Sequence, residues 1–150
     1  MSAAGETIHA SALAVAGKGI VIRGVSGSGK SSLLLALLTA VPSAMLVADD
    51  RVILSASGSG VEAAVPDAIA GQMEVRGLGV VRRPFVSPVP VALVADLLPL
   101  EQCPRMPGPD RRAVLLAGVA VPRICIAIGS IHAPARVLAA LAAFTDNTLI

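Results

Sequence analysis

Aromatic side chains are almost absent from this 150-residue chain, which has two Phe, no Tyr and no Trp. It therefore lacks the stacking surfaces that single-stranded nucleic acids bind. Charged residues are also few, at 15%, and the formal net charge of +2 is too small to indicate a nucleic-acid or membrane partner. Hydrophobic residues make up 55%. This composition excludes a disordered chain, because disordered chains are polar and highly charged.

Cysteines and membrane-spanning runs are scarce as well. Cys103 and Cys125 form no CxxC pair and are too few for a disulfide framework, so we expect two plain thiols. The longest uncharged run, residues 31–48, is interrupted by Pro42, whereas a spanning helix needs about 20 largely apolar residues. No basic segment precedes an apolar core at the N-terminus, so we expect no signal peptide. The sequence therefore predicts one cytoplasmic domain over residues 1–150.

Hydrophobic patterning predicts an α/β core with additional β-structure. The strong helix of the first half is residues 31–40, which are apolar nearly all round, and residues 133–144 are expected to form a closing helix. The prolines at positions 84, 88 and 90 limit the next segment of the chain to edge strands or loops. The predicted strands are residues 7–15, 19–23, 44–48, 52–56, 61–65, 91–95, 113–116 and 124–128.

The clearest motif is GVSGSGKS at residues 24–31, which matches the phosphate-binding pattern G-x-x-x-x-G-K-[ST]. Its glycines let successive backbone N–H groups point at phosphate oxygens, and the following helix presents its positive N-terminus to the same anion. Lys30 is expected to reach the β- and γ-phosphates, and the Ser31 hydroxyl to bind Mg²⁺. The motif comes after a predicted strand and begins a predicted helix, which is the structural context that it requires.

Carboxylates supply the next candidates. Asp49 and Asp50 come directly after an apolar strand, and the carboxyl ends of strands in open α/β sheets face the ligand crevice. Neighbouring side chains of a strand point to opposite faces, so the two carboxylates can share one site only if the chain bends there. Glu74 lies between glycines that allow close backbone approach. By itself, however, a Glu next to Arg76 is most simply a surface pair.

Together these residues resemble the HPr kinase/phosphorylase family, specifically its C-terminal catalytic domain. The resemblance extends over about residues 6–82 and is most specific at the Glu-Val-Arg-Gly-Leu-Gly signature. It is carried by His9, by GVSGSGKS at 24–31, by LVADDRV at 46–52 and by MEVRGLGVV at 73–81.

The resemblance implies a P-loop fold related to that of phosphoenolpyruvate carboxykinase, with ATP and Mg²⁺ as cofactors. Family members transfer the γ-phosphoryl group of ATP to a seryl hydroxyl of HPr, a small phosphocarrier protein of the sugar phosphotransferase system. They also reverse this modification with inorganic phosphate, releasing pyrophosphate. The resemblance further implies a homo-oligomer, because family members assemble as hexamers.

The family's roles carry over by position. Asp49 is expected to be the base toward the serine and the acid in the reverse direction, Lys30 to stabilise the transferring group, and His9 to lie near the phosphates. Arg76 supports the site or contacts the partner. The nucleotide-binding residues are expected to be Gly24, Ser26, Gly27, Ser28, Gly29, Lys30, Ser31 and Ser32. The metal-binding residues are expected to be Ser31, Asp50 and Glu74.

The sequence departs from the family's pattern at Ser32, where the family usually has Glu, and at residues 106–112, which match its Pro-Gly-Arg loop only loosely. It resembles the short form of the family, without the additional N-terminal domain. Two alternatives to the bifunctional enzyme stay open on these grounds. One is a non-catalytic ATP-sensing module of the phosphotransferase system. The other is a small-metabolite kinase, although the sequence has no arginine-rich lid of the kind those enzymes carry.

Overall fold

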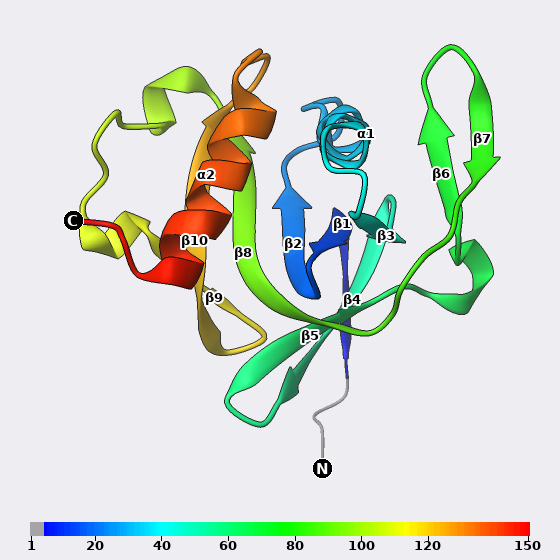
Figure 1. Ribbon diagram of the computed structural model, residues 1–150, viewed down its shortest axis with the longest axis horizontal. Helices are drawn as coiled ribbons and strands as arrows, with labels where there is room; N and C mark the ends of the chain where they lie inside the picture. Colours follow the sequence, from blue (N-terminus) through cyan, green and yellow to red (C-terminus); the bar gives the residue numbers. More distant parts are fainter. Residues whose placement is uncertain (1–4) are drawn as a thin grey trace.

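A computed structural model describes residues 5–150, in which two helices lie on one face of a strongly bent sheet (Figure 1). The helices are α1 (Lys30–Ala40) and α2 (Ala133–Asp146), with short 3-10 helices η1 (Asp67–Ile69), η2 (Leu100–Gln102) and η3 (Pro109–Arg111). The strands are β1 (Glu6–Val15), β2 (Lys18–Arg23), β3 (Met45–Ala48), β4 (Arg51–Ser57), β5 (Gly60–Ala64), β6 (Gln72–Val75), β7 (Gly79–Arg82), β8 (Val89–Leu98), β9 (Ala113–Leu116) and β10 (Val119–Ala127).

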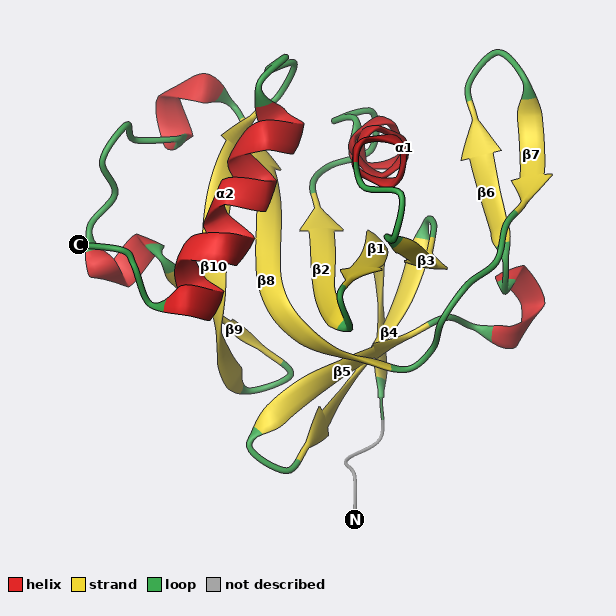
Figure 2. Cartoon of the chain, viewed as in Figure 1, coloured by secondary structure: helices red, strands yellow, loops and turns green. Residues whose placement is uncertain are grey.

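Two long strands give the sheet its bend. The first half of β1 pairs with β4, and its second half pairs with β2 and β3. In the same way β8 begins beside β5 and continues beside β2 and β10. The pairings β2–β1–β4–β5–β8 return to β2, so these five strands form a closed ring. Strands β6 and β7 form a separate hairpin, which projects beyond the main sheet in Figure 2.

The parallel part of the sheet is what positions the functional site. Strand β8 is parallel both to β2 and to β10, so the carboxyl ends of these three strands lie at one edge. The loop after β2 leads into α1, and the loop after β10 leads into α2. In open α/β sheets this edge is where ligands bind.

Each face of the sheet has its own hydrophobic core. One core joins α1 and α2 to the sheet through buried residues such as Leu34, Leu37 and Val137. The other lies on the opposite side, where β4, β5 and β9 curl over smaller residues such as Ala12 and Val94. Successive residues of one strand serve different cores, because side chains alternate between the faces of a strand.

The structure confirms both predicted helices and all eight predicted strands, with shifts at their ends. The expectation that the prolines limit β8 to an edge is wrong, because β8 lies between β2 and β10. Pro90 stands where β8 passes from β5 to β2, and the register of the β2 pairing shifts just beyond it. The missing N–H of a proline is tolerated at such an irregularity. Gly19 permits close contact there, since a Cβ on it would lie 2.7 Å from the Pro90 oxygen.

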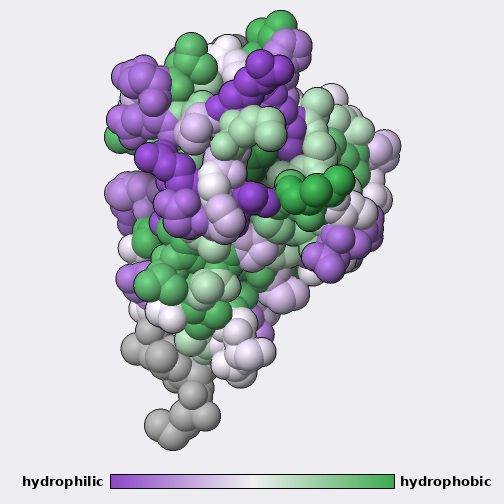
Figure 3. Space-filling view, turned by 90° about the vertical axis from the view of Figure 1, so that its left-hand side faces the viewer, coloured by the Kyte–Doolittle hydropathy of each residue, from purple (hydrophilic) through white to green (hydrophobic). Residues whose placement is uncertain are grey.

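The surface mixes apolar and polar groups. On the face that Figure 3 shows, hydrophobic side chains reach the surface between hydrophilic ones. Leu100, Met106 and Leu115 are among the large hydrophobic residues that are more than two-thirds exposed. Across residues 5–150, no helix combines the length and the apolarity needed to cross a lipid bilayer.

Candidate functional site

The glycine-rich motif forms a tight loop between β2 and α1. Gly27 and Gly29 have φ values of +80° and +101°, in the left-handed region that favours glycine. Lys30 donates hydrogen bonds from Nζ to the carbonyl oxygens of Gly24 (2.8 Å) and Val25 (3.1 Å), so the loop curls around the ammonium group. Within residues 5–150 no side chain caps the start of α1, so the backbone N–H groups of its first turn can donate hydrogen bonds to an anion.

Gly24 and Ser28 form the tightly packed base of this loop. A Cβ on Gly24 would lie 2.4 Å from Ser28 Oγ and 3.1 Å from the Leu97 Cβ, so only glycine fits at that position. Ser28 is 6% exposed, and its hydroxyl has no hydrogen-bond partner within residues 5–150. These two residues therefore shape the loop from beneath. The motif residues that line the opening above it are Ser26, Gly27, Gly29, Lys30 and Ser31.

Asp49 is buried beneath the loop and is held by three hydrogen bonds. Its Oδ1 accepts one from Ser31 Oγ (2.7 Å) and one from Ser11 Oγ (2.9 Å), and its Oδ2 accepts one from the backbone N–H of Glu74 (3.1 Å). The carboxylate thus joins α1, β1 and the β6–β7 hairpin. Sequence reasoning missed Ser11, although a hydroxyl residue within the apolar run of β1 was a usable signal.

Asp50 is oriented quite differently from Asp49. Its backbone has a φ of +76°, and its carbonyl oxygen accepts a hydrogen bond from the Ala10 N–H (3.2 Å). This is the bend that the sequence required if both carboxylates were to share one site. The Asp50 side chain is 72% exposed, with His9 Nδ1 3.8 Å from its Oδ1 and Arg51 Nε 4.0 Å from its Oδ2.

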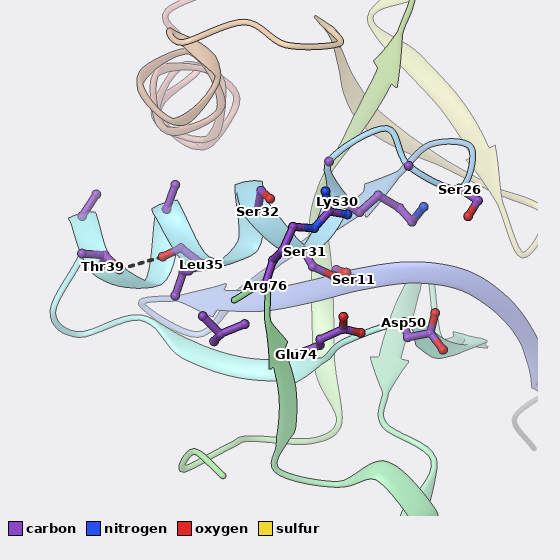
Figure 4. A pocket seen from close by; sticks show the side chains of 15 residues that line it. Ser11, Ser26, Lys30, Ser31, Ser32, Leu35, Thr39, Asp50, Glu74 and Arg76 are labelled. Atoms are coloured by element: carbon purple, nitrogen blue, oxygen red, sulfur yellow. Dashed lines mark hydrogen bonds between the residues drawn. The ribbon is translucent and has the colours of Figure 1, made fainter. Parts of the chain in front are cut away.

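These elements enclose a cavity of about 710 Å³. In Figure 4, Asp50 and Glu74 lie below the start of α1, and Arg76 extends toward that helix from the hairpin. The structure thus brings Asp50, Glu74 and Arg76 to the same cavity as the motif. Asp49 lies beneath the loop, and His9 lies beside Asp50. The predicted site residues that line the cavity are Ser26, Gly27, Gly29, Lys30, Ser31, Ser32, Asp50, Glu74 and Arg76.

A second charged cluster lies just before the loop and was not predicted. Asp96 of β8, only 5% exposed, accepts hydrogen bonds from Arg23 Nε (2.8 Å) and Nη2 (2.9 Å), and also from Arg123 Nε (2.5 Å). The hydrogen bond to Asp96 raises the pKa of the Arg23 guanidinium. The cluster joins the carboxyl-terminal halves of the three parallel strands and so fixes the position at which the loop begins. An Asp inside the apolar run of β8 was its only sequence signal.

The fold and the site together define a mixed α/β domain with an anion-accepting loop beside a pair of carboxylates. Its fold matches the solved structure described as the Hpr(Ser) kinase/phosphatase from Coxiella burnetii, with a TM-score of 0.80 and 25% sequence identity. The match covers 95% of this chain and 98% of that one.

The family model described as the HPr serine kinase C-terminal domain matches residues 2–85, and the chain belongs to this family. The match includes the loop, both aspartates and the β6–β7 hairpin, and it confirms the resemblance found in the sequence. HPr kinase/phosphorylases from Bordetella pertussis and Bordetella bronchiseptica are each 46% identical over 74 residues. That segment is 49% of this chain and 23% of each relative, so the chain matches about a quarter of their length.

Proposed function

We propose that this chain is the catalytic domain of a cytoplasmic HPr serine kinase/phosphorylase with a P-loop fold of the phosphoenolpyruvate-carboxykinase type. In this proposal it transfers the γ-phosphoryl group of ATP to a seryl hydroxyl of an HPr-type protein, with Mg²⁺, and reverses the modification with inorganic phosphate. The family membership, the names of the relatives and the anion-accepting loop support this proposal.

The observation that carries the mechanism is the different setting of the two aspartates. Both oxygens of Asp49 already accept hydrogen bonds within the protein, and one donor is the Ser31 hydroxyl. Asp50 lines the cavity, and its carboxylate accepts no hydrogen bond from residues 5–150, while His9 stands at 3.8 Å. A base needs a free oxygen within reach of the proton that it removes. We therefore propose to exchange the roles given by the sequence: Asp50 is the base, and Asp49 orients the metal-binding serine.

In the kinase direction, the seryl oxygen of the acceptor attacks the γ-phosphorus while Asp50 accepts the hydroxyl proton. The bond from the γ-phosphorus to the β–γ bridging oxygen breaks, and ADP leaves with that electron pair. Lys30 and the N–H groups at the start of α1 stabilise the charge on the transferring oxygens. Most of the rate enhancement then comes from positioning and electrostatics, as is usual for phosphoryl transfer.

In the reverse direction, an oxygen of inorganic phosphate attacks the phosphorus of phosphoserine. The bond to the seryl oxygen breaks, and the protonated Asp50 returns its proton to that oxygen. Pyrophosphate forms in place of ATP. The same loop holds the attacking phosphate, because this phosphate takes the position that the β-phosphate of ATP would take.

The donor set fits Mg²⁺, which prefers oxygen ligands and keeps several waters and phosphate oxygens around it. Ser31 Oγ, which Asp49 holds in place at 2.7 Å, would bind the ion, and Glu74 would bind it directly or through water. Within residues 5–150, no three His, Cys, Asp or Glu side chains form a cage for a metal. When bound, the ion neutralises charge on the phosphates.

The test compares Asp50→Asn with Asp49→Asn, using labelled ATP, Mg²⁺ and an HPr protein of matched source. Asp50→Asn is expected to lower transfer about 10²- to 10⁴-fold while leaving MgATP affinity nearly unchanged. Asp49→Asn is expected to weaken MgATP binding, because its single amide oxygen can accept from Ser31 only by turning the NH₂ group toward the Glu74 N–H, which then loses its acceptor and shifts the site. If wild-type protein leaves HPr unmodified, the proposed activity is wrong. If Asp50→Asn transfers at the wild-type rate, the base is elsewhere.

The second candidate is a non-catalytic ATP-sensing module. The observation that favours it is the position of residues 99–112, which include the loose Pro-Gly-Arg match and do not line the main cavity. Tight MgATP binding, with neither HPr modification nor pyrophosphate formation, would support this alternative.

A further inference from the structure

The proposed mechanism gives no role to one buried hydroxyl beside the site. Ser11 lies in β1 between Ala10 and Ala12, and its side chain points to the opposite face of the strand from theirs. It is 0% exposed, so its hydroxyl needs a hydrogen-bond partner within the protein. That partner is Asp49, whose Oδ1 lies 2.9 Å from Ser11 Oγ. Although it is closed to water, Ser11 forms part of the cavity floor, and Figure 4 shows it next to Ser31.

This hydroxyl is one of three donors that orient the Asp49 carboxylate. An ionised carboxylate only accepts hydrogen bonds, so Ser11 and Ser31 both direct their protons at its Oδ1. The backbone N–H of Glu74 binds its Oδ2. Rotation about the last side-chain bond of an Asp has broad energy wells. The three donors therefore decide where the two carboxylate oxygens lie.

The three donors come from elements of different kinds. Ser31 belongs to the first turn of α1, and Glu74 belongs to the hairpin, which is separate from the main sheet. Ser11 belongs to the sheet itself, where β1 pairs with β2 through Ser11 and Ile22 and, one residue further on, also with β3. Ser11 is thus the donor that fixes the carboxylate relative to the sheet.

Both metal-binding groups of the proposed function depend on this carboxylate. Because the Ser31 proton points at Asp49, the lone pairs of Ser31 Oγ are free for a cation, and their direction follows the carboxylate. Glu74 is placed by its own backbone N–H, which is held by the other oxygen. Loss of a group that orients metal ligands typically weakens metal binding by about 10- to 100-fold. A displaced Asp49 would therefore move the two ligands relative to each other.

We propose that Ser11 is a positioning residue for the metal. Through Asp49 it sets the directions of Ser31 Oγ and Glu74, and it therefore strengthens nucleotide binding only when Mg²⁺ is present. The proposal rests on the proposed function for the identity of the metal ligands. A hydroxyl that only stabilised the fold would affect nucleotide binding equally with and without the metal. The quantity that separates the two roles is the metal-dependent gain, defined as the Kd for ADP in EDTA divided by the Kd for ADP in excess Mg²⁺.

The test compares Ser11→Thr with Ser11→Val, using calorimetry of ADP binding to the whole chain. The two side chains have nearly the same shape, and only Thr keeps the hydroxyl, so strain from the added methyl group is common to both. Ser11→Val is expected to lower the metal-dependent gain about tenfold and to leave the Kd in EDTA unchanged. Ser11→Thr is expected to keep the gain of the wild type.

Thr7→Val is the matched control, because it removes a hydroxyl from an exposed position of the same strand that does not line the cavity. It is expected to bind ADP as the wild type does in both solutions. Circular dichroism shows whether each variant is folded. If neither Ser11→Thr nor Ser11→Val folds, Ser11→Ala decides, because it needs no additional space and is expected to lose the gain as well.

Three results would overturn the positioning role. The first is a wild-type gain in Ser11→Val or, where that variant does not fold, in Ser11→Ala. The second is a loss of ADP affinity that is equal in EDTA and in Mg²⁺, which would assign the hydroxyl to the fold alone. The third is a loss of gain in Ser11→Thr as large as in Ser11→Val, because the hydroxyl would then not be the cause.

These outcomes are independent of the catalytic proposal. A gain that is lost in Ser11→Val, together with wild-type protein that leaves HPr unmodified, would overturn the kinase and leave the positioning role standing. Phosphate on HPr, together with an unchanged gain in Ser11→Val, would do the reverse. Wild-type protein that binds ADP equally well in EDTA and in Mg²⁺ would overturn the positioning role, and wild-type protein that binds no ADP would overturn both.

Discussion

At the residue scale, a single backbone angle gives the two aspartates different surroundings. The φ of +76° at Asp50 turns its side chain out of the strand direction and into the cavity, while Asp49 stays buried under three hydrogen bonds. An Asp tolerates this left-handed conformation better than most residues. Identical side chains, adjacent in sequence, can therefore have separate functions.

Lys30 provides the first prediction at this scale. Lys30→Ala removes the ammonium group that now bridges the carbonyls of Gly24 and Val25. Transfer to HPr is expected to fall by about 10²- to 10³-fold, the usual effect of losing one group that stabilises transition-state charge. The free energy of unfolding is expected to change by about 1 kcal/mol or less, because the lost bonds are partly exposed. Labelled-ATP assays and urea denaturation measure the two effects.

Lys18→Ala is the control for this variant, since Lys18 is the only other lysine in the chain and is the first residue of β2. It is expected to transfer phosphate as the wild type does. Wild-type activity in Lys30→Ala would contradict the role of the loop as a phosphate site.

Sequence reasoning found most of the residues around the main cavity, because the loop motif and the two short acidic segments carry strong local patterns. It could not show which aspartate faces the cavity, because that depends on the bend at Asp50 and on donors from Ser11 and Glu74, which lie far apart in the chain. The Asp96 cluster was missed for the same reason. Its two arginines come from β2 and β10, and only the pairing of those strands with β8 brings them together.

At the element scale, the β6–β7 hairpin completes the site from outside the main sheet. Met73 anchors the hairpin, because its side chain is 1% exposed and packs into the helix-side core. The next residue, Glu74, donates its backbone N–H to Asp49. Val80 of the same hairpin is 69% exposed. Met73, together with the partly buried Val81 and the Glu74–Asp49 hydrogen bond, therefore holds the hairpin beside the loop.

Met73→Ala tests this anchor. The substitution is expected to destabilise the domain by about 2–5 kcal/mol, the usual effect of removing a large side chain from a core. Transfer is expected to fall further than MgATP affinity, because Asp49 and Glu74 shift while the loop keeps its shape. Val80→Ala is the matched control, with an expected change within about 0.5 kcal/mol. Urea denaturation that shows the same stability for both variants would contradict the anchoring role.

The elements themselves were predictable from hydrophobic runs and punctuating glycines, whereas their pairing was not. The expectation for β8 failed because it considered only the missing N–H of Pro90. The register of the β2–β8 pairing shifts beside Pro90, so this N–H is not needed there. The hairpin was seen only as a segment between glycines, because its four-residue strands are too short for a clear alternation.

At the scale of the whole molecule, the two cores are coupled through shared strands. Leu13 of β1 packs in the helix-side core, and its neighbours Ala12 and Ala14 pack in the other. Strand β8 is shared in the same way, through Leu93 and Val94. Loss of either core removes one face of these strands, so we expect the domain to unfold in a single transition.

Ligand binding should be visible in that transition. Any ligand that binds only the folded chain stabilises it by RT ln(1 + [L]/Kd), which is about 2.7 kcal/mol at one hundred times Kd. For a domain of this size that corresponds to a rise in Tm of about 5–10 °C. After the Kd for MgATP has been measured by calorimetry, differential scanning calorimetry at that ratio is expected to show this rise in the wild type. Lys30→Ala at the same MgATP concentration is expected to show little or none. A wild-type Tm that stays constant as MgATP is raised would mean that the loop does not hold the nucleotide in the folded state, whatever its sequence suggests.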